Sequence, residues 1–238
     1  MLAQDCGKFL PMPRQCIGRP IPFQRAAPAE TGRPRHPQLG KVIDFMAIAP
    51  TTQTGTDDDL PRISRPVVLV GLMGAGKSCI GRKLAESLSL PFMDSDSEVE
   101  EAAGCEVRDI FEVYGEPAFR DCERRVIQRL LQGGPAVIAT GGGAFMDPET
   151  REEVKAHAIS MWLRAEPEVL HQRTKRSRHR PLLAKDNPLQ VLKDLAAQRY
   201  PVYAEADITI DTGNEGLEKT LQKAIDALRS GAAGDTTS

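Results

Sequence analysis

The sequence lacks the features that would mark it for a membrane or for nucleic acid. Thirty-one Lys and Arg residues against 33 Asp and Glu give a formal charge of −2, so the chain has no excess of positive charge for a polyanion. No run reaches the ~18 continuous apolar residues of a membrane span, and the first residues lack the apolar core of a secretory signal. We therefore expect no membrane or nucleic-acid partner and a cytoplasmic location.

Cysteine is scarce and shows no pattern. The chain has no C-x-x-C pair and no cysteine spacing suited to zinc. An odd number of cysteines without pairing signals indicates free thiols in a reducing compartment. The five are Cys6, Cys16, Cys79, Cys105 and Cys122.

Serine is absent from residues 1–60, which hold eight of the 18 prolines and no sustained apolar period. Because organellar transit peptides are usually rich in serine, a disordered extension, or an upstream start with Met46 as the true start, is favoured. We predict a disordered N-terminal extension or linker at 1–62, one P-loop domain at 63–230 and a flexible tail at 231–238.

The predicted domain alternates short apolar runs with longer amphipathic segments, which indicates an α/β fold with a parallel sheet covered by helices. Helical periodicity follows the first run, precedes the third and follows the last. The expected strands, which together fit one doubly wound sheet, are 67–70, 91–93, 136–139, 158–163 and 208–210.

The segment 71–78 reads GLMGAGKS and satisfies the pattern G-x-x-x-x-G-K-[ST] between an apolar strand and a helix. Its glycines allow successive backbone N–H groups to point at phosphate oxygens, and the start of the helix adds positive potential. Lys77 is expected to reach the β- and γ-phosphates, and Ser78 to bind Mg²⁺. A plain turn between strand and helix would need neither side chain.

Two carboxylates, Asp94 and Asp96, follow the second predicted strand, at the sheet edge where α/β proteins bind ligands. In extended backbone both side chains would face the same way. One could then hold Mg²⁺ through water while the other orients a substrate hydroxyl. The alternative is a turn that caps the next helix, and the pair alone does not choose between them.

Further along the chain, charged side chains alternate with glycine. Arg120 and Glu123 are spaced to pair on a helix, a pattern more typical of a surface ion pair. Residues 141–143 are three glycines at a strand end, which indicates close approach of a ligand or a flexible turn. The basic segment 173–180 is interpreted as a lid over phosphates or a solvated surface. Arg199 suits bidentate binding of a carboxylate.

In this order and spacing, the motifs resemble the shikimate kinase family over about residues 65 to 228. The resemblance implies a P-loop NTPase fold with a five-stranded parallel sheet, order 2-3-1-4-5, flanked by helices and with a mobile lid. It implies a monomer that converts ATP and shikimate to ADP and 3-phosphoshikimate, with one Mg²⁺ ion per ATP. The matching motifs are 71–78, 94–96, 119–120 with 123, 141–143, 180–183, and 199 with 203.

The resemblance also assigns roles on the ATP side. Ser78 and Asp94 would bind Mg²⁺, the latter through water. Arg173 would lie over the adenine, and Arg180 would reach the phosphates from the lid. The phosphate-binding residues would be Gly74, Ala75, Gly76, Lys77, Ser78 and Cys79, the last where the family often has threonine.

On the acceptor side, Asp96 would bind the ring hydroxyls and orient or deprotonate the attacking one. Arg120 and Arg199 would clamp the substrate carboxylate. The backbone of Gly141, Gly142 and Gly143 would touch the ring. Lys77, Asp96 and Arg180 would be the catalytic residues. A gluconate kinase, a nucleoside-monophosphate kinase or a catalytically silent nucleotide-binding regulator stays open as an alternative.

Overall fold

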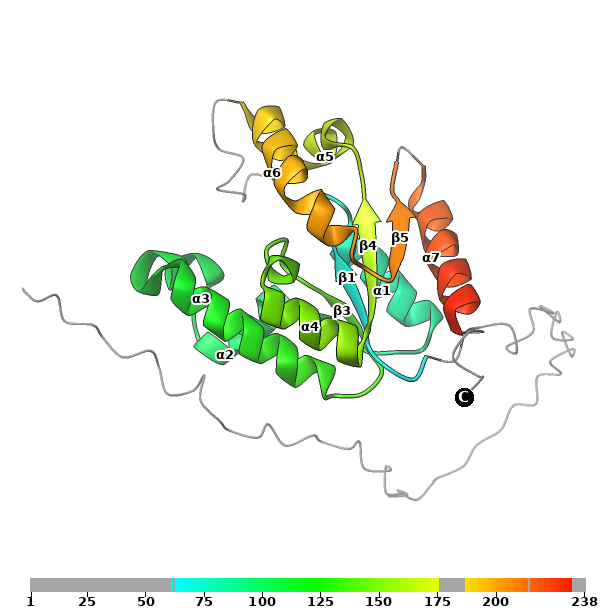
Figure 1. Cartoon of the computed structure of the whole chain (residues 1–238), viewed down its shortest axis with the longest axis horizontal. Coiled ribbons are helices and arrows are strands. Elements are labelled where there is room, and N and C mark those ends of the chain that lie inside the picture. The colour runs from blue at the N-terminus through cyan, green and yellow to red at the C-terminus, as the bar shows by residue number, and fades with distance from the viewer. Residues whose placement is uncertain (1–60, 62, 176–186, 214, 233–238) are drawn as a thin grey trace, which may run out of the picture. The chain divides into compact units, whose positions relative to one another are not determined.

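The computed structural model describes residues 61, 63–175, 187–213 and 215–232. These residues form a five-stranded parallel sheet of order β2-β3-β1-β4-β5, which confirms the predicted order (Figure 1). The strands are β1 Val67–Val70, β2 Phe92–Asp94, β3 Val137–Ala139, β4 Ile159–Arg164 and β5 Ile208–Asp211.

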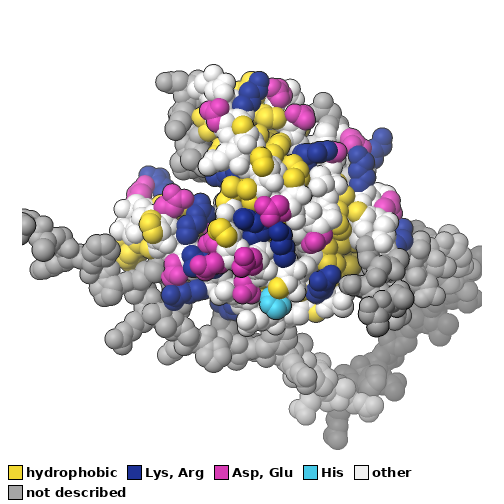
Figure 2. All heavy atoms as spheres, viewed as in Figure 1, with side chains coloured by type: hydrophobic (Ala, Val, Ile, Leu, Met, Phe, Trp, Pro, Cys, Tyr) yellow, Lys and Arg dark blue, Asp and Glu magenta, His cyan; other side chains and the backbone are white. Residues whose placement is uncertain are grey.

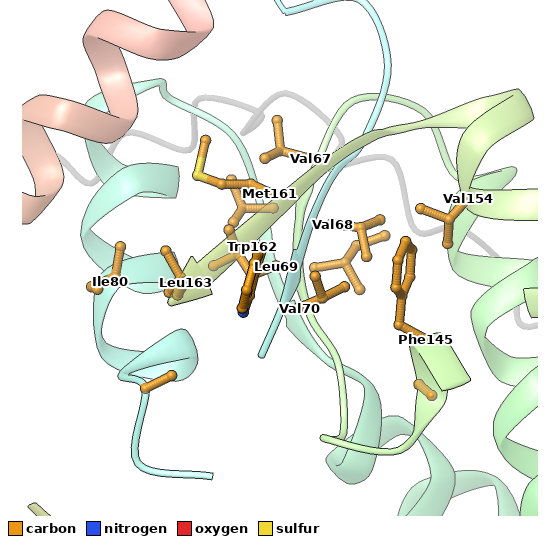
Figure 3. Packing of buried hydrophobic residues seen from close by; sticks show 14 of the residues in the cluster. Val67, Val68, Leu69, Val70, Ile80, Phe145, Val154, Met161, Trp162 and Leu163 are labelled. Atoms are coloured by element: carbon orange, nitrogen blue, oxygen red, sulfur yellow. The ribbon is translucent and has the colours of Figure 1, made fainter. Parts of the chain in front are cut away.

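The central strand β1 is apolar along its whole length because both of its faces are covered. It pairs with β3 on one side and with β4 on the other, and Val67 to Val70 are at most 1% exposed. Figure 3 shows Val68 on the side of Phe145 and Val154, whereas Met161 and Leu163 lie on the side of Ile80. Helices therefore pack on both faces of the sheet.

Eight helical segments connect and cover the strands within the described part of the chain. Helices α1 and α7 lie on one face of the sheet, and α3 and α4 on the other (Figures 1 and 3). Helices α5 and α6 pack together beyond the carboxyl end of β4. The bounds are α1 Lys77–Ser87, α2 Ser95–Ala103, α3 Val107–Leu131, η3 Ala144–Met146 (a 3₁₀ turn), α4 Pro148–His157, α5 Pro167–Thr174, α6 Pro188–Tyr203 and α7 Leu217–Ala232.

Local sequence explains where several helices begin. The Asp147 carboxylate accepts from the N–H groups of Glu149 and Thr150, and Pro148 occupies the first turn of α4. Asn187 caps α6 in the same manner, accepting from the N–H of Gln190. These caps satisfy N–H groups that have no partner inside the helix.

Helix α3 is broken at Gly115, whose φ of 81° and ψ of 169° are not helical. Pro117 follows two residues later, so the break falls where the sequence offers both a flexible and a rigid residue. The kink separates a first segment from the longer segment that carries Arg120 and Glu123. It thereby sets the direction in which those two side chains leave the helix.

The predicted strands differ from the observed ones by one residue at several ends, and β2 extends to Asp94. Most of the predicted 1–62 extension and the end of the predicted 231–238 tail lie outside the described residues, so the three-part division stays a prediction. In the described ranges no helix has both the length and the apolar character needed to cross a membrane.

Candidate active site

The phosphate-binding loop connects β1 to α1. Gly76 adopts the left-handed conformation, φ 97°, and α1 begins at Lys77. The Lys77 ammonium donates to the carbonyl oxygens of Gly71 at 2.7 Å and Leu72 at 3.1 Å, so it lies across the loop. Backbone N–H groups together with a nearby cation bind the negatively charged oxygens of an oligophosphate, and this loop provides both.

The middle of the loop touches helix α5. Gly74 has φ 83°, and a Cβ placed there would lie 2.7 Å from Cγ2 of Thr174. The neighbouring Arg173 reaches toward the segment after β5, donating to the carbonyl oxygens of Thr212 at 3.2 Å and Gly213 at 2.5 Å. Helix α5 thus lies against the loop, and Arg173 joins it to the residues that directly follow β5.

Ser78 and Asp94 meet at the edge of the sheet. The Ser78 hydroxyl donates to Oδ2 of Asp94 at 2.9 Å, which joins the start of α1 to the end of β2. Hydroxyl and carboxylate oxygens are the donors that Mg²⁺ prefers, with phosphate and water completing its shell. Among the described residues no group of three or more His, Cys, Asp or Glu forms a metal site. The Ser78–Asp94 pair offers two oxygen atoms of the kind that bind Mg²⁺.

Asp96 lies in the first turn of α2, so the expectation of extended backbone at 94–96 was wrong. Asp94 caps that helix, its Oδ1 accepting from the Asp96 N–H at 3.2 Å, because a carboxylate there satisfies a free helix N–H. The capping alternative is thus confirmed, and the role of Asp94 and Asp96 in a binding site stays a prediction. Burial of the carboxyl region, followed by the nearby Asp94, raises the pKa of Asp96.

Arg120 and Glu123 form a pair that is not on the surface, contrary to the expectation from their spacing. The Arg120 Nη1 donates to Oε2 of Glu123 at 2.7 Å, and the Glu123 side chain is only 3% exposed. Burial raises the pKa of Glu123, while Arg120 opposes the rise. The other oxygen, Oε1, is buried with no hydrogen-bond partner in the described part of the chain.

The three glycines after β3 leave room for charged side chains. A Cβ at Gly141 would lie 2.8 Å from Oδ1 of Asp96 and 2.8 Å from Oε1 of Glu123. A Cβ at Gly143 would lie 2.5 Å from the Arg120 Nη atoms. These contacts explain why the smallest residue is needed there. The structure thus brings Asp96, Glu123 and Arg120 to one strip of backbone, residues 141–143.

Arg199 reaches the same strip from helix α6. Its Nη1 donates to the Gly142 carbonyl oxygen at 2.8 Å. The hydroxyl of Tyr203, one turn later, donates to the same oxygen. Two guanidinium groups, those of Arg120 and Arg199, therefore flank one glycine strip next to the phosphate loop, which is an arrangement suited to a small anion with hydroxyl groups.

Residues 73–229 match the family model described as shikimate kinase. The chain belongs to the shikimate kinase family. This membership favours the resemblance seen in the motifs over the gluconate kinase and nucleoside-monophosphate kinase alternatives. It also shows that the chain is a member of a family of ATP-using kinases.

Curated relatives share about half of their residues with this chain. It is 53% identical over 167 residues to the shikimate kinase of Paramagnetospirillum magneticum, covering 70% of this chain and 86% of that protein. It is 54% identical over 164 residues to the shikimate kinase of Rhodopseudomonas palustris, covering 69% of this chain and 81% of that protein.

Solved shikimate kinases share the fold. The enzyme of Acinetobacter baumannii, solved in complex with shikimate, is 40% identical with a TM-score of 0.67 and covers 73% of this chain and 96% of that one. The Aquifex aeolicus enzyme is 34% identical with a TM-score of 0.63, and the match covers 71% of this chain and 99% of that one.

Part of the predicted lid at 173–180 is described: Arg173 and Thr174 end helix α5. Residues 176–180, including Arg180, lie outside the described residues. Thr212 and Gly213, which hold Arg173, follow the last strand without a motif, and only their position after a strand end gave a signal. Cys79 lies beside Ser78 in the first turn of α1 and is exposed, whereas a small apolar side chain was expected to be buried.

Proposed function

We propose that this chain transfers the γ-phosphoryl group of ATP to the 3-hydroxyl of shikimate, giving 3-phosphoshikimate and ADP. The observation that carries the proposal is the meeting of Asp96, Arg120 and Arg199 at the glycine strip 141–143, beside a phosphate-binding loop. A carboxylate-bearing ring with hydroxyl groups matches that set of charges.

Arg120 and Arg199 would hold the substrate carboxylate from two sides. Arg120 keeps its orientation through Glu123 at 2.7 Å and through Glu116 at 3.1 Å. Arg199 keeps its orientation through Gly142. Since both guanidinium groups are fixed before substrate arrives, less conformational freedom is lost on binding.

Asp96 would hold the hydroxyl that attacks. Its pKa is raised, so as a carboxylate Asp96 is a stronger base than an ordinary surface aspartate. Once the ring is clamped at its carboxylate, the oxygen held by Asp96 has one line of approach to the phosphorus. In the loose transition state of phosphoryl transfer, this alignment accounts for much of what the protein must supply.

On the donor side, Ser78 and Asp94 would bind Mg²⁺, Asp94 through water, and the ion would neutralise charge on the phosphates. Lys77 would exchange its contacts with the Gly71 and Leu72 carbonyls for phosphate oxygens. Arg173 and the Thr212–Gly213 segment would receive the adenine. The contact of Arg180 with the phosphates stays a prediction.

A coupled assay of ADP release tests the function. Mg-ATP is supplied with shikimate, quinate, gluconate or AMP, each in a separate reaction. We expect ADP release that depends on shikimate and 3-phosphoshikimate as the product by mass spectrometry. Release with another acceptor alone would keep a kinase and reject the substrate. No release with any acceptor would favour a nucleotide-binding regulator.

We infer the monomeric state and the cytoplasmic location from the membership of the shikimate kinase family. Light scattering coupled to size exclusion measures the mass directly. For a monomer of this chain it should return the sequence mass of 26.0 kDa. A doubled mass would reject the monomer.

A further inference from the structure

Tyr203 is buried, and its hydroxyl bonds to the carbonyl oxygen that also holds Arg199. We propose that Tyr203 is a positioning residue for the acceptor: by fixing the Gly142 carbonyl it orients both the Arg199 guanidinium and the glycine strip. The proposal rests on the proposed function, since it concerns how the same site holds shikimate.

The Gly142 carbonyl oxygen has two lone pairs and two donors. One is Nη1 of Arg199 at 2.8 Å, and the other is the hydroxyl of Tyr203, the last residue of α6. Tyr203 is 1% exposed, so its ring has one position and its hydroxyl cannot turn to solvent. With Nη1 committed to this carbonyl, the rest of the planar guanidinium is left for a carboxylate.

Anchoring that carbonyl also sets the direction of the next N–H group. The peptide between Gly142 and Gly143 is planar, so the Gly143 N–H points away from its carbonyl partner. Within the described ranges this N–H has no hydrogen-bond partner, and Gly143 is only half-buried. A free donor held at a fixed angle beside Arg120 is suited to an oxygen of a bound ring.

Tyr200 offers a matched control on the same helix. Its hydroxyl donates to the Ala165 carbonyl, just beyond β4 and away from the glycine strip. Both tyrosine rings pack on Trp162, with ring centroids 5.0 Å away for Tyr200 and 5.9 Å for Tyr203. Each Tyr→Phe change therefore removes one hydroxyl from the same aromatic cluster, but only one of them releases Gly142.

The experiment compares Tyr203→Phe with Tyr200→Phe in the full-length chain. KM for shikimate, KM for ATP, kcat and the melting temperature are measured for each. We expect Tyr203→Phe to raise KM for shikimate by about threefold to tenfold, the range of one net hydrogen bond, with KM for ATP unchanged. Tyr200→Phe should leave both KM values at the wild-type level.

The outcomes separate the two proposals. If the wild-type chain shows no shikimate-dependent ADP release, the proposed function fails. If the wild type is active but both variants lose shikimate affinity equally, or Tyr203→Phe changes neither KM, the positioning role is overturned. A loss shared by both substrates, or a fall in melting temperature far beyond that of Tyr200→Phe, would also overturn it, because Tyr203 would then support the fold and not the acceptor.

Discussion

At the scale of single residues, the site holds two carboxyl groups whose pKa is raised: Glu123, which is buried, and Asp96, which stays exposed to solvent. Burial is the leading cause that raises the pKa of both Asp96 and Glu123. A carboxyl whose folded pKa exceeds its unfolded value makes the protein less stable above the folded pKa. That destabilisation disappears as the pH falls below the unfolded value. The site therefore lowers the stability of the ligand-free protein at neutral pH.

Asp96→Asn should separate activity from stability. We expect kcat to fall by about 10²–10⁴, the usual effect of losing a general base. At pH 7 the melting temperature should rise only slightly, because solvent screens the charge of the exposed Asp96, and the gain should shrink as the pH approaches the unfolded pKa. Thermal unfolding from pH 7 to pH 4 measures it, with the exposed Glu152→Gln as control. A melting temperature that falls at pH 7 would contradict the inference that the ionised Asp96 destabilises the folded protein.

Gly143→Ala tests whether the glycine strip exists to admit Arg120. The new methyl would lie 2.5 Å from the Arg120 Nη atoms, at the flexible end of that side chain, so the arginine should move while the fold stays intact. We expect KM for shikimate to rise about tenfold or more, since misplacement of a clamp is costly. In the control, Gly216→Ala, the methyl meets no atom within 4 Å. Unchanged kinetics for Gly143→Ala would show that Arg120 is not needed in this position.

At the scale of elements, the sequence predicts regular parts well and long-range contacts poorly. Parallel strands buried on both faces read as short apolar runs, and the phosphate loop has a motif of its own. The buried state of Glu123 was missed because a spacing of three residues is identical in surface pairs and buried pairs. The contact from Arg173 to Thr212 joins positions with no shared pattern. The Gly115–Pro117 break, in contrast, had a local signal.

Gly115→Ala tests the break in α3. A φ of 81° with a ψ of 169° is a region that is nearly exclusive to glycine, so alanine should be strained by about 1–3 kcal/mol. We expect a lower melting temperature and, because the kink directs the segment with Arg120, weaker shikimate binding. Thermal unfolding and calorimetric titration measure the two effects. A stabilised variant would mean that α3 can straighten without loss.

At the scale of the whole molecule, the fold gathers residues that lie far apart in the sequence. Asp96, Arg120, Gly142 and Arg199 come from four segments and meet at the carboxyl edge of one sheet. The surface elsewhere has charges of both signs side by side, as on the face in Figure 2. Lys155 and Glu205, whose side chains are 44% and 41% exposed, form one such pair. Exposed pairs of this kind add little stability, so the core and the site determine the behaviour of the enzyme.

Removal of residues 1–60 tests the predicted division of the chain. The first strand begins at Val67, and every residue assigned to the site follows it. We expect a chain starting at Pro61 to keep kcat and both KM values within about twofold, since no site residue is lost. Steady-state kinetics of the two chains give the comparison. A tenfold loss would mean that the N-terminal segment contributes to catalysis.

The glycine strip also constrains how this protein can evolve. Each of its residues lies against a charged group: Gly141 against Asp96 and Glu123, Gly142 against Arg199, and Gly143 against Arg120. A single mutation that adds a side chain to one of these glycines displaces the neighbouring charged side chain before any new substrate can benefit. A single mutation that shortens the charged side chain leaves a gap that the glycine does not fill. New acceptor specificity would thus require paired substitutions, whose separate effects are both harmful and whose joint effect is not additive. Lineages should therefore change this strip rarely, and change it together with its charged neighbours.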